Sequence, residues 1–123
     1  MATNSVLIVD DDPDLCHLLG GILRNRNLQV GIASNLNAAE ACISEIKPFI
    51  IFLDHNLPDG AGIDFIAKIA EIDPEIQVVL MTADSTPGIE VRAFEKGADH
   101  FLVKPFTYAI INGIIDMVLS ERA

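Results

Sequence analysis

The sequence predicts an α/β protein with a doubly wound, five-stranded parallel sheet and helices on both faces. Five short apolar runs recur along the 123 residues, and each is followed by a segment whose apolar residues have helical spacing. The runs are nearly continuous rather than alternating, which is typical of parallel strands covered on both faces. Five units of about 25 residues fill the chain. We therefore expect a single domain over residues 1–123, with no linker and no output domain in this chain.

The predicted strands share a run of apolar residues with few charges. They are Ser5–Val9, Gln29–Ala33, Phe49–Leu53, Gln77–Met81 and Phe101–Val103. After each strand, apolar residues at spacings of three and four predict one buried helix face. The expected buried faces are Leu15, Leu18, Leu19, Ile22 and Leu23; Ala39, Cys42, Ile43 and Ile46; Ile63, Ile66, Ala67 and Ala70; a weaker helix near Ile89–Glu95; and Ile111, Ile114, Ile115 and Val118.

Residues with known preferences for helix ends support these boundaries. Asp12 is a good N-cap, with Pro13 at the first helical position, where its missing N–H costs nothing. Asn37 and Glu40 have the spacing of a capping box at the second helix. Gly97 is suited to end the fourth helix, because glycine readily adopts a left-handed conformation.

Two adjacent glycines, Gly20 and Gly21, interrupt the first predicted helix. Each costs up to about 1 kcal/mol relative to alanine in a helix interior. Close packing of this helix against a neighbour is the simplest expectation for the pair.

Composition excludes several classes of partner. Eight basic and eighteen acidic residues give a net charge of −10, which disfavours direct contact with nucleic acid or an anionic membrane. Two cysteines, Cys16 and Cys42, are too few for a disulfide framework and suggest a reducing compartment. No stretch has the length of a membrane span, and the N-terminus lacks the pattern of a signal peptide. We expect a cytoplasmic protein.

Polar residues with complementary chemistry follow four of the predicted strands. Asp10 and Asp11 follow the first strand, Asp54 the third, Thr82 the fourth and Lys104 the fifth. In an open parallel sheet, ligands bind beyond the carboxyl ends of the strands, where the winding reverses. Three carboxylates in one pocket favour a cation, and carboxylate oxygens with room for water and phosphate suit Mg²⁺.

Four segments of the chain contain or flank these polar residues: "LIVDDD", "FLDHNLPDGAG", "LMTAD" and "LVKPF". In this order and spacing, they resemble the signature segments of the CheY-like response-regulator receiver domain of two-component signalling. Each segment alone is a weak match, but the four together are specific and span essentially the whole chain. The resemblance implies a flavodoxin-like (βα)5 fold with strand order 2-1-3-4-5.

The resemblance also implies roles for the acidic residues. Asp54 matches the phosphoryl-accepting aspartate, a carboxylate nucleophile that forms an acyl phosphate. Asp11 matches a direct Mg²⁺ ligand, and Asp10 matches the acid that usually reaches the metal through a water molecule. Asn56 matches the position whose backbone carbonyl completes the protein's share of the ligands. Mn²⁺ is an alternative to Mg²⁺ in such a site.

Four further positions match the family's switch and its phosphoryl contacts. Thr82 matches the hydroxyl that turns toward the phosphoryl group, and Lys104 the ammonium that pairs with it. The peptide bond before Pro105 is expected to be cis. Phe101 falls where the family has an aromatic residue that moves with Thr82, although its residue type alone favours a simple core role.

The function implied is phosphoryl transfer in signalling. Asp54 would take the phosphoryl group from a phosphohistidine of a sensor histidine kinase or a histidine phosphotransfer protein, in a Mg²⁺-dependent step. The product would switch the surface of the fourth helix, fifth strand and fifth helix. Ile110 and Met117 lie off the buried face of the fifth helix and fit a homodimer or partner surface. The protein would catalyse its own phosphorylation and dephosphorylation without being an autonomous enzyme.

Other interpretations of the same residues stay open. Acids before a helix are usually caps, and Asp12 and Asp14 suit the start of a helix. An EF-hand is excluded because Leu15 replaces its glycine and Gly21 its final glutamate. An autonomous aspartyl-phosphate phosphatase would carry its nucleophile after the first strand, whereas Asp54 follows the third. An interaction module with a degenerate site would have lost one of the five matched positions.

Overall fold

A five-stranded parallel sheet forms the centre of the protein in the computed structural model, which describes residues 4–84 and 86–122. The strands of this sheet are β1 (Ser5–Val9), β2 (Gln29–Ala33), β3 (Ile50–Asp54), β6 (Gln77–Thr82) and β7 (His100–Val103). The helices are α1 (Pro13–Arg24), α2 (Leu36–Ile46), α3 (Gly62–Ile72), α4 (Ile89–Glu95) and α5 (Tyr108–Arg122). The strand order is β2-β1-β3-β6-β7, which confirms the predicted 2-1-3-4-5 topology.

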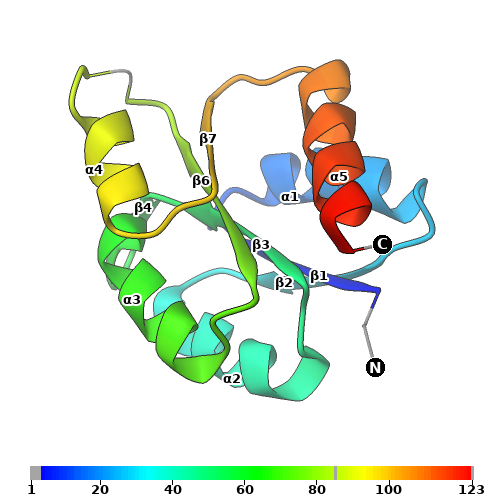
Figure 1. The fold of residues 1–123 in the computed structure, drawn as a ribbon, viewed down its shortest axis with the longest axis horizontal. Coiled ribbons are helices and arrows are strands. Elements are labelled where there is room, and N and C mark those ends of the chain that lie inside the picture. The colour runs from blue at the N-terminus through cyan, green and yellow to red at the C-terminus, as the bar shows by residue number, and fades with distance from the viewer. Residues whose placement is uncertain (1–3, 85, 123) are drawn as a thin grey trace.

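The helices cover both faces of the sheet, α1 and α5 on one side and α2, α3 and α4 on the other (Figure 1). Successive residues of β1 point to opposite faces, so Val6 and Ile8 pack with α1 and α5, whereas Leu7 and Val9 pack with α2 and α3. All five residues of β1 are buried. This burial on both faces explains why the strands read as unbroken apolar runs.

A short antiparallel hairpin, which the sequence patterns did not predict, lies between β3 and α3. Its strands are β4 (Asn56–Leu57) and β5 (Gly60–Ala61), joined at Pro58 and Asp59. Strands of two residues are too short for any hydrophobic periodicity to be visible. The hairpin carries the chain from the end of β3 to the start of α3.

The first helix begins as predicted, but the second does not. The side chain of Asp12 accepts hydrogen bonds from the backbone N–H groups of Asp14 and Leu15, at 3.0 and 3.4 Å. The predicted capping box at Asn37 was wrong, because α2 begins two residues earlier and its N-cap is Asn35. The Asn35 side chain accepts a hydrogen bond from the N–H of Ala38 at 2.7 Å.

Two of the predicted buried faces also need correction. Leu18 on α1 is 60% exposed, so the buried face of this helix is centred on Cys16, Leu19, Ile22 and Leu23. On α3, Ala67 and Ala70 are exposed, and the buried positions are Gly62, Ile63, Phe65, Ile66 and Ile69. In both helices the apolar spacing fits two adjacent stripes, and only contact with the sheet selects one of them.

The glycine pair in α1 does not mark a close helix contact. A Cβ atom on Gly21 would have nothing within 4 Å, and a Cβ on Gly20 would meet only the Arg24 side chain of the same helix, at 3.0 Å. Gly97, by contrast, follows the end of α4 with a φ of +109°, the left-handed conformation expected of it.

Within the described residues, none of the helices has the length and apolarity needed to cross a membrane.

Candidate functional site

The register of the sheet brings the polar strand ends together. Val9 pairs with Leu53, so Asp10 follows β1 directly beside Asp54, the last residue of β3. Asp54 itself pairs with Met81, one residue before Thr82 at the end of β6. Thr82 pairs with Val103, and the backbone N–H of Lys104 donates to the Thr82 carbonyl at 2.8 Å. Residues separated by up to 94 positions in the chain thus meet at one edge of the sheet.

Lys104 joins the two buried carboxylates of this edge. Its Nζ atom lies 2.8 Å from Oδ2 of Asp10 and 3.0 Å from Oδ1 of Asp54. Asp10 and Asp54 are almost completely buried, whereas the Lys104 side chain is 20% exposed. The peptide bond between Lys104 and Pro105 is cis. Pairing with this ammonium group offsets part of the cost of burying the two carboxylates.

Three carboxylates form a cluster with the geometry of a cation site. One ligand oxygen each from Asp10, Asp11 and Asp54 lies within 4.8 Å of the others. Asp11 is exposed, so the cluster is open to solvent on one side. Hard oxygen ligands from a few carboxylates, with room for water, fit Mg²⁺ or Mn²⁺ better than a soft metal. The donor set therefore fits the predicted cation, with Asp10, Asp11 and Asp54 as the side chains that would hold it.

Burial and hydrogen bonding together determine the pKa shifts of Asp54 and Lys104. Burial raises the pKa of Asp54 above its ordinary value, against the opposing effect of the hydrogen bond from Lys104. The backbone amide of Asn56 also favours the ionised form of Asp54. Burial opposes the charge on Lys104, but its hydrogen bonds to Asp10 and Asp54 outweigh that effect and raise the pKa of Lys104. Lys104 is thus a permanent cation at neutral pH, held against the carboxylate of Asp54.

Thr82 is fully buried and presents an oriented hydroxyl group. Its Oγ1 accepts a hydrogen bond from the backbone N–H of Asp84 at 2.9 Å. The hydroxyl hydrogen is thus left to be donated elsewhere. The carboxylate of Asp84 points into its own loop, where it accepts from the backbone N–H of Thr86 at 2.8 Å and from the Thr86 hydroxyl.

Asn56 and His55 lie in the segment that leaves Asp54. The Asn56 backbone amide contacts the Asp54 carboxylate, and its side chain is exposed. The Nδ1 atom of His55 is buried and has no hydrogen-bond partner among the described residues. The hydrogen bonds from Thr86 lower the pKa of Asp84, and the nearby His55 adds a smaller effect in the same direction.

Phe101 and several apolar residues of α4, β7 and α5 are partly or largely exposed. Phe101 is half-buried on β7 and packs against the core cluster formed with α2, α3 and α4. Ile110 and Met117 are 47% and 53% exposed on α5, as their position off the buried face predicts. Three further large apolar residues on α4 and β7 are exposed: Val91, Phe94 and Val103.

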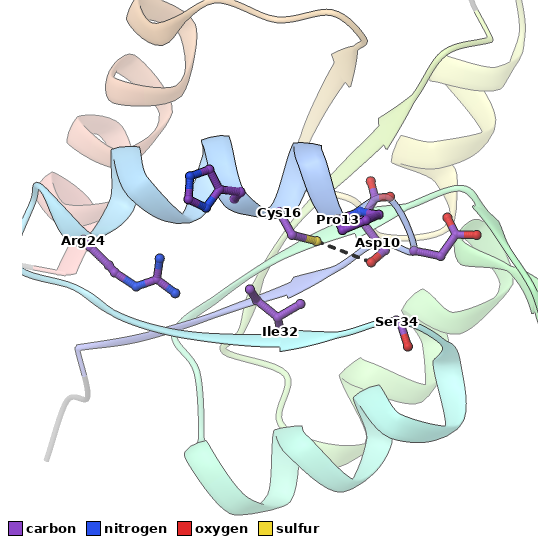
Figure 2. Close-up of a pocket in the computed structure, with 8 residues that line it drawn as sticks. Asp10, Pro13, Cys16, Arg24, Ile32 and Ser34 are labelled. Atoms are coloured by element: carbon purple, nitrogen blue, oxygen red, sulfur yellow. Dashed lines mark hydrogen bonds between the residues drawn. The ribbon is translucent and has the colours of Figure 1, made fainter.

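A cavity of about 420 Å³ between α1 and β2 lies next to Asp10 and Asp11 (Figure 2). Asp10 and Asp11 line one part of it and Arg24 another, with Ile32 and Ser34 contributed by the β2 region. The buried Cys16 thiol donates to the Asp10 carbonyl at 3.4 Å, drawn as a dashed line in Figure 2. Burial and the neighbouring carboxylates raise the pKa of Cys16 to about 11, which keeps the thiol protonated for this contact. Asp54, Thr82 and Lys104 do not line the cavity.

Two residues of the segment "FLDHNLPDGAG" help to position the site, although the sequence patterns assigned neither an individual role. Gly62, the first residue of α3, lies so close to β3 that a Cβ atom there would be 2.1 Å from the Asp54 carbonyl oxygen. Asp59, at the hairpin turn, accepts hydrogen bonds from two backbone N–H groups of α2. The Pro-Asp-Gly sequence at 58–60 is a turn signal that could have located the hairpin, but not the contact across it.

Comparison with known proteins identifies the family. A model of the response regulator receiver domain matches residues 6–116. The DNA-binding response regulator MtrA of Mycolicibacterium smegmatis is 32% identical over 82% of this chain and 44% of its own length. The response regulator protein PilR of Pseudomonas aeruginosa is 32% identical over 99% of this chain and 27% of its own length. The chain therefore spans less than half of the length of these relatives.

Solved structures agree in fold and extent. The beryllofluoride-activated NtrC4 receiver domain dimer has a TM-score of 0.92 and 33% identity, and the match covers 98% of this chain and 100% of that one. A two-component response regulator from Clostridium difficile has a TM-score of 0.91 and 29% identity, with 97% of each chain covered. With the matched family model and the polar cluster at the strand ends, these similarities lead to one conclusion. The chain belongs to the family of response regulator receiver domains of two-component systems.

Proposed function

We propose that Asp54 accepts a phosphoryl group from a phosphohistidine of a sensor histidine kinase or a histidine phosphotransfer protein. One observation carries the proposal: the Asp54 carboxylate lies in a cluster with Asp10 and Asp11, and Lys104 is 3.0 Å from it. A nucleophile, a cation site and a fixed ammonium group are the parts that phosphoryl transfer to a carboxylate requires.

The proposed step exchanges one bond to phosphorus for another. An oxygen of the ionised Asp54 carboxylate attacks phosphorus, a P–O bond forms, and the P–N bond of the phosphohistidine breaks. The electron pair of that bond returns to the imidazole of the donor, which then takes up a proton. A bound Mg²⁺ ion would neutralise charge on the phosphoryl oxygens and orient them.

The chain's own residues supply the remaining interactions. Lys104 already donates a hydrogen bond to Asp54, and it can donate another N–H group to a phosphoryl oxygen without leaving the site. The buried Thr82 hydroxyl, whose oxygen is oriented by the Asp84 N–H, has its hydrogen available for the same group. Asp10 and Asp11 would hold the cation together with Asp54 and the backbone carbonyl of Asn56.

The output surface in this proposal consists of α4, β7 and α5. Movement of Thr82 toward a new phosphoryl dianion would change the environment of the half-buried Phe101 on β7. The exposed apolar residues of this surface suit a homodimer contact: Val91, Phe94, Val103, Ile110 and Met117. The similar NtrC4 receiver domain is a dimer when activated with beryllofluoride, which supports the proposal. Sedimentation with Mg²⁺ and beryllofluoride should yield a dimer of this chain; an unchanged monomer would exclude a dimeric output.

The proposal concerns the receiver domain itself. MtrA is named a DNA-binding regulator and matches this chain over less than half of its length, so the absence of a nucleic-acid partner stays a prediction for these residues alone. A single domain over residues 1–123 and a cytoplasmic location also stay predictions, the latter in keeping with the two free cysteines.

Labelling with acetyl phosphate tests the acceptor. With Mg²⁺ present, the mass of the intact protein should rise by one phosphoryl group, and chelation of Mg²⁺ should prevent the change. Asp54→Asn should abolish labelling, whereas Asp64→Asn, the same substitution at an exposed position of α3, should not. Peptide mapping should locate the label on residue 54. Undiminished labelling of Asp54→Asn would refute the assignment, and turnover of small phosphomonoesters would favour a phosphatase instead.

A further inference from the structure

The segment between Asp54 and α3 is a closed hairpin rather than a free loop. Asn56 pairs with Ala61 and Leu57 with Gly60, so the turn residues are Pro58 and Asp59. The base of the segment is closed by a hydrogen bond from the Gly62 N–H to the His55 carbonyl, at 2.8 Å. The hairpin is therefore paired along its length and closed at its base, with Asn56 near the base and Asp59 at the tip.

The tip of this hairpin is fastened to the start of another helix. Oδ1 of Asp59 accepts from the backbone N–H of Leu36 at 2.8 Å, and Oδ2 accepts from that of Asn37 at 3.0 Å. These N–H groups lie in the first turn of α2, where they have no partner within the helix. The helix is thus capped twice, locally by Asn35 at the N–H of Ala38 and from a distance by Asp59.

Apolar packing reinforces the same contact. A Cβ atom on Gly60 would lie 3.0 Å from Cδ1 of Leu36, so the hairpin lies directly against the first residue of α2. Leu36, Leu57 and Ala61 all pack against the core cluster that α2 and α3 share. The hydrogen bonds from Asp59 are therefore part of a fitted interface between two neighbouring loops.

The base of the hairpin touches the reacting carboxylate. The backbone amide of Asn56 interacts with the side chain of Asp54, and the carbonyl of Asn56 is the proposed backbone ligand of the cation. A cation site depends on ligand positions held to within about 0.5 Å, and loops hold such positions less well than strands. Without the anchor at its tip, the hairpin could pivot about this closed base, and the backbone of Asn56 would shift with it.

We propose that Asp59 is a positioning residue of the cation site: by fastening the hairpin tip to α2, it holds the Asn56 backbone in place beside Asp54. This inference rests on the proposed function, because it assumes that the carboxylate cluster binds a divalent cation. The simpler alternative is that Asp59 only stabilises α2 as a cap. The two differ in one respect, which is whether the loss of Asp59 reaches the cation.

The chain offers a matched control for this comparison. Asp59→Ala and Asn35→Ala each remove side-chain caps from the same end of α2, but only Asp59 connects that end to the hairpin. Asp59→Asn keeps one acceptor oxygen and should be intermediate. Mg²⁺ affinity is measured by isothermal titration calorimetry on the unphosphorylated protein stripped of metal, with Mn²⁺ and electron paramagnetic resonance as a second probe. Far-UV circular dichroism establishes that each variant is folded.

The expected result is that Asp59→Ala weakens Mg²⁺ binding by about tenfold, in line with losses measured for residues that orient metal ligands. Asn35→Ala should retain the wild-type affinity despite its lower helix stability. Equal weakening in both variants, or none in Asp59→Ala, would overturn the positioning role while leaving the proposed function intact. If Asp59→Ala does not fold, Asp59→Asn is compared with Asn35→Ala, and equal affinity overturns the role. Absence of Mg²⁺ binding by the wild type would overturn the cation site and this inference together.

Discussion

Replacement of Gly62 by alanine tests how closely α3 must approach the backbone of Asp54. The added Cβ atom would lie 2.1 Å from the carbonyl oxygen of Asp54 and 2.9 Å from its carbonyl carbon. A normal carbon–oxygen contact is about 3.3 Å at its shortest, so the helix and β3 must separate by roughly 1.2 Å. Both neighbours are backbone atoms, and no side-chain rotation can relieve the clash.

The expected effect is large for a single methyl group. Overpacking of a tight contact costs about 1–3 kcal/mol, and a clash between backbone segments belongs at the upper end. A loss of about 3 kcal/mol would lower the melting temperature by about 12 °C for a chain of this length. The same displacement exceeds the ~0.5 Å tolerance of a metal or catalytic site. Gly62→Ala should therefore also weaken Mg²⁺ binding and phosphoryl labelling.

Urea unfolding followed by circular dichroism measures the change in stability. Gly21→Ala is the matched control, because it adds the same methyl group to an exposed helical position with nothing within 4 Å. That control should stabilise the protein by up to about 1 kcal/mol, since alanine favours the helix more than glycine does. The two substitutions thus have opposite predicted signs. A Gly62→Ala protein with the wild-type midpoint and slope would refute the close approach of α3 to β3.

Three further predictions concern the charges of the site. Mg²⁺ should raise the melting temperature of the unmodified protein. At a Mg²⁺ concentration a hundred times the dissociation constant, the free energy of unfolding should rise by up to about 2.7 kcal/mol. Asp54→Asn should reduce the shift in melting temperature measured by differential scanning calorimetry. Lys104→Met should destabilise the metal-free protein by about 3 kcal/mol in urea, because it leaves Asp10 and Asp54 buried without their cation, and Mg²⁺ should restore part of the loss. The hydrogen bond from the Leu36 N–H holds the pKa of Asp59 below its unfolded value of 3.8. Ionised Asp59 therefore stabilises the folded protein above that pH, and this stabilisation is lost as the pH falls through the folded pKa. Acid unfolding of Asp59→Asn should consequently converge with that of the wild type at low pH; a constant difference would contradict this linkage.

The fold was predictable because each of its units is locally consistent. Buried parallel strands require continuous apolar runs, and the five runs in the sequence correspond to the five strands of the sheet with ends that differ by at most one residue. The boundary at Asp54 is one such difference: the chain remains in β3 through this residue, because its backbone still pairs with Met81. Burial of individual helix positions was less predictable. Leu18 fits the helical spacing as well as Leu19 does, and only the direction of the sheet decides which of the two is buried.

The carboxylates and Lys104 were predictable as a set because parallel strands share one carboxyl edge. The contacts that hold the set were not. Asp59 is 23 residues from Leu36, and its hydrogen bond depends on how one loop lies against another, which no local pattern encodes. The constraint on Gly62 likewise depends on a contact between separate elements, which no local pattern encodes. Its need to be glycine comes from the distance to the β3 backbone and not from its own backbone angles.

The arrangement explains why four aspartates can stand within five positions at the start of the chain. The Asp12 side chain caps α1 by accepting hydrogen bonds from the N–H groups of its first turn, and Asp14 lies in that turn, where the helix dipole favours a negative charge. Asp10 and Asp11 remain, and with Asp54 they bring three formal negative charges to a site where Lys104 supplies one positive charge. A divalent cation would neutralise the remaining two. Under the proposed function, phosphorylation would replace the single charge of Asp54 by about −1.5 to −2, which would leave the site with an excess of negative charge of at most one. In the proposed function, Lys104, 3.0 Å from Asp54, and Thr82, at the end of the neighbouring strand β6, would respond to that excess. Both lie at strand ends that lead into α4 or α5. In the proposed function, charge balance at this edge of the sheet would therefore be the physical link between Asp54 and the surface of α4, β7 and α5.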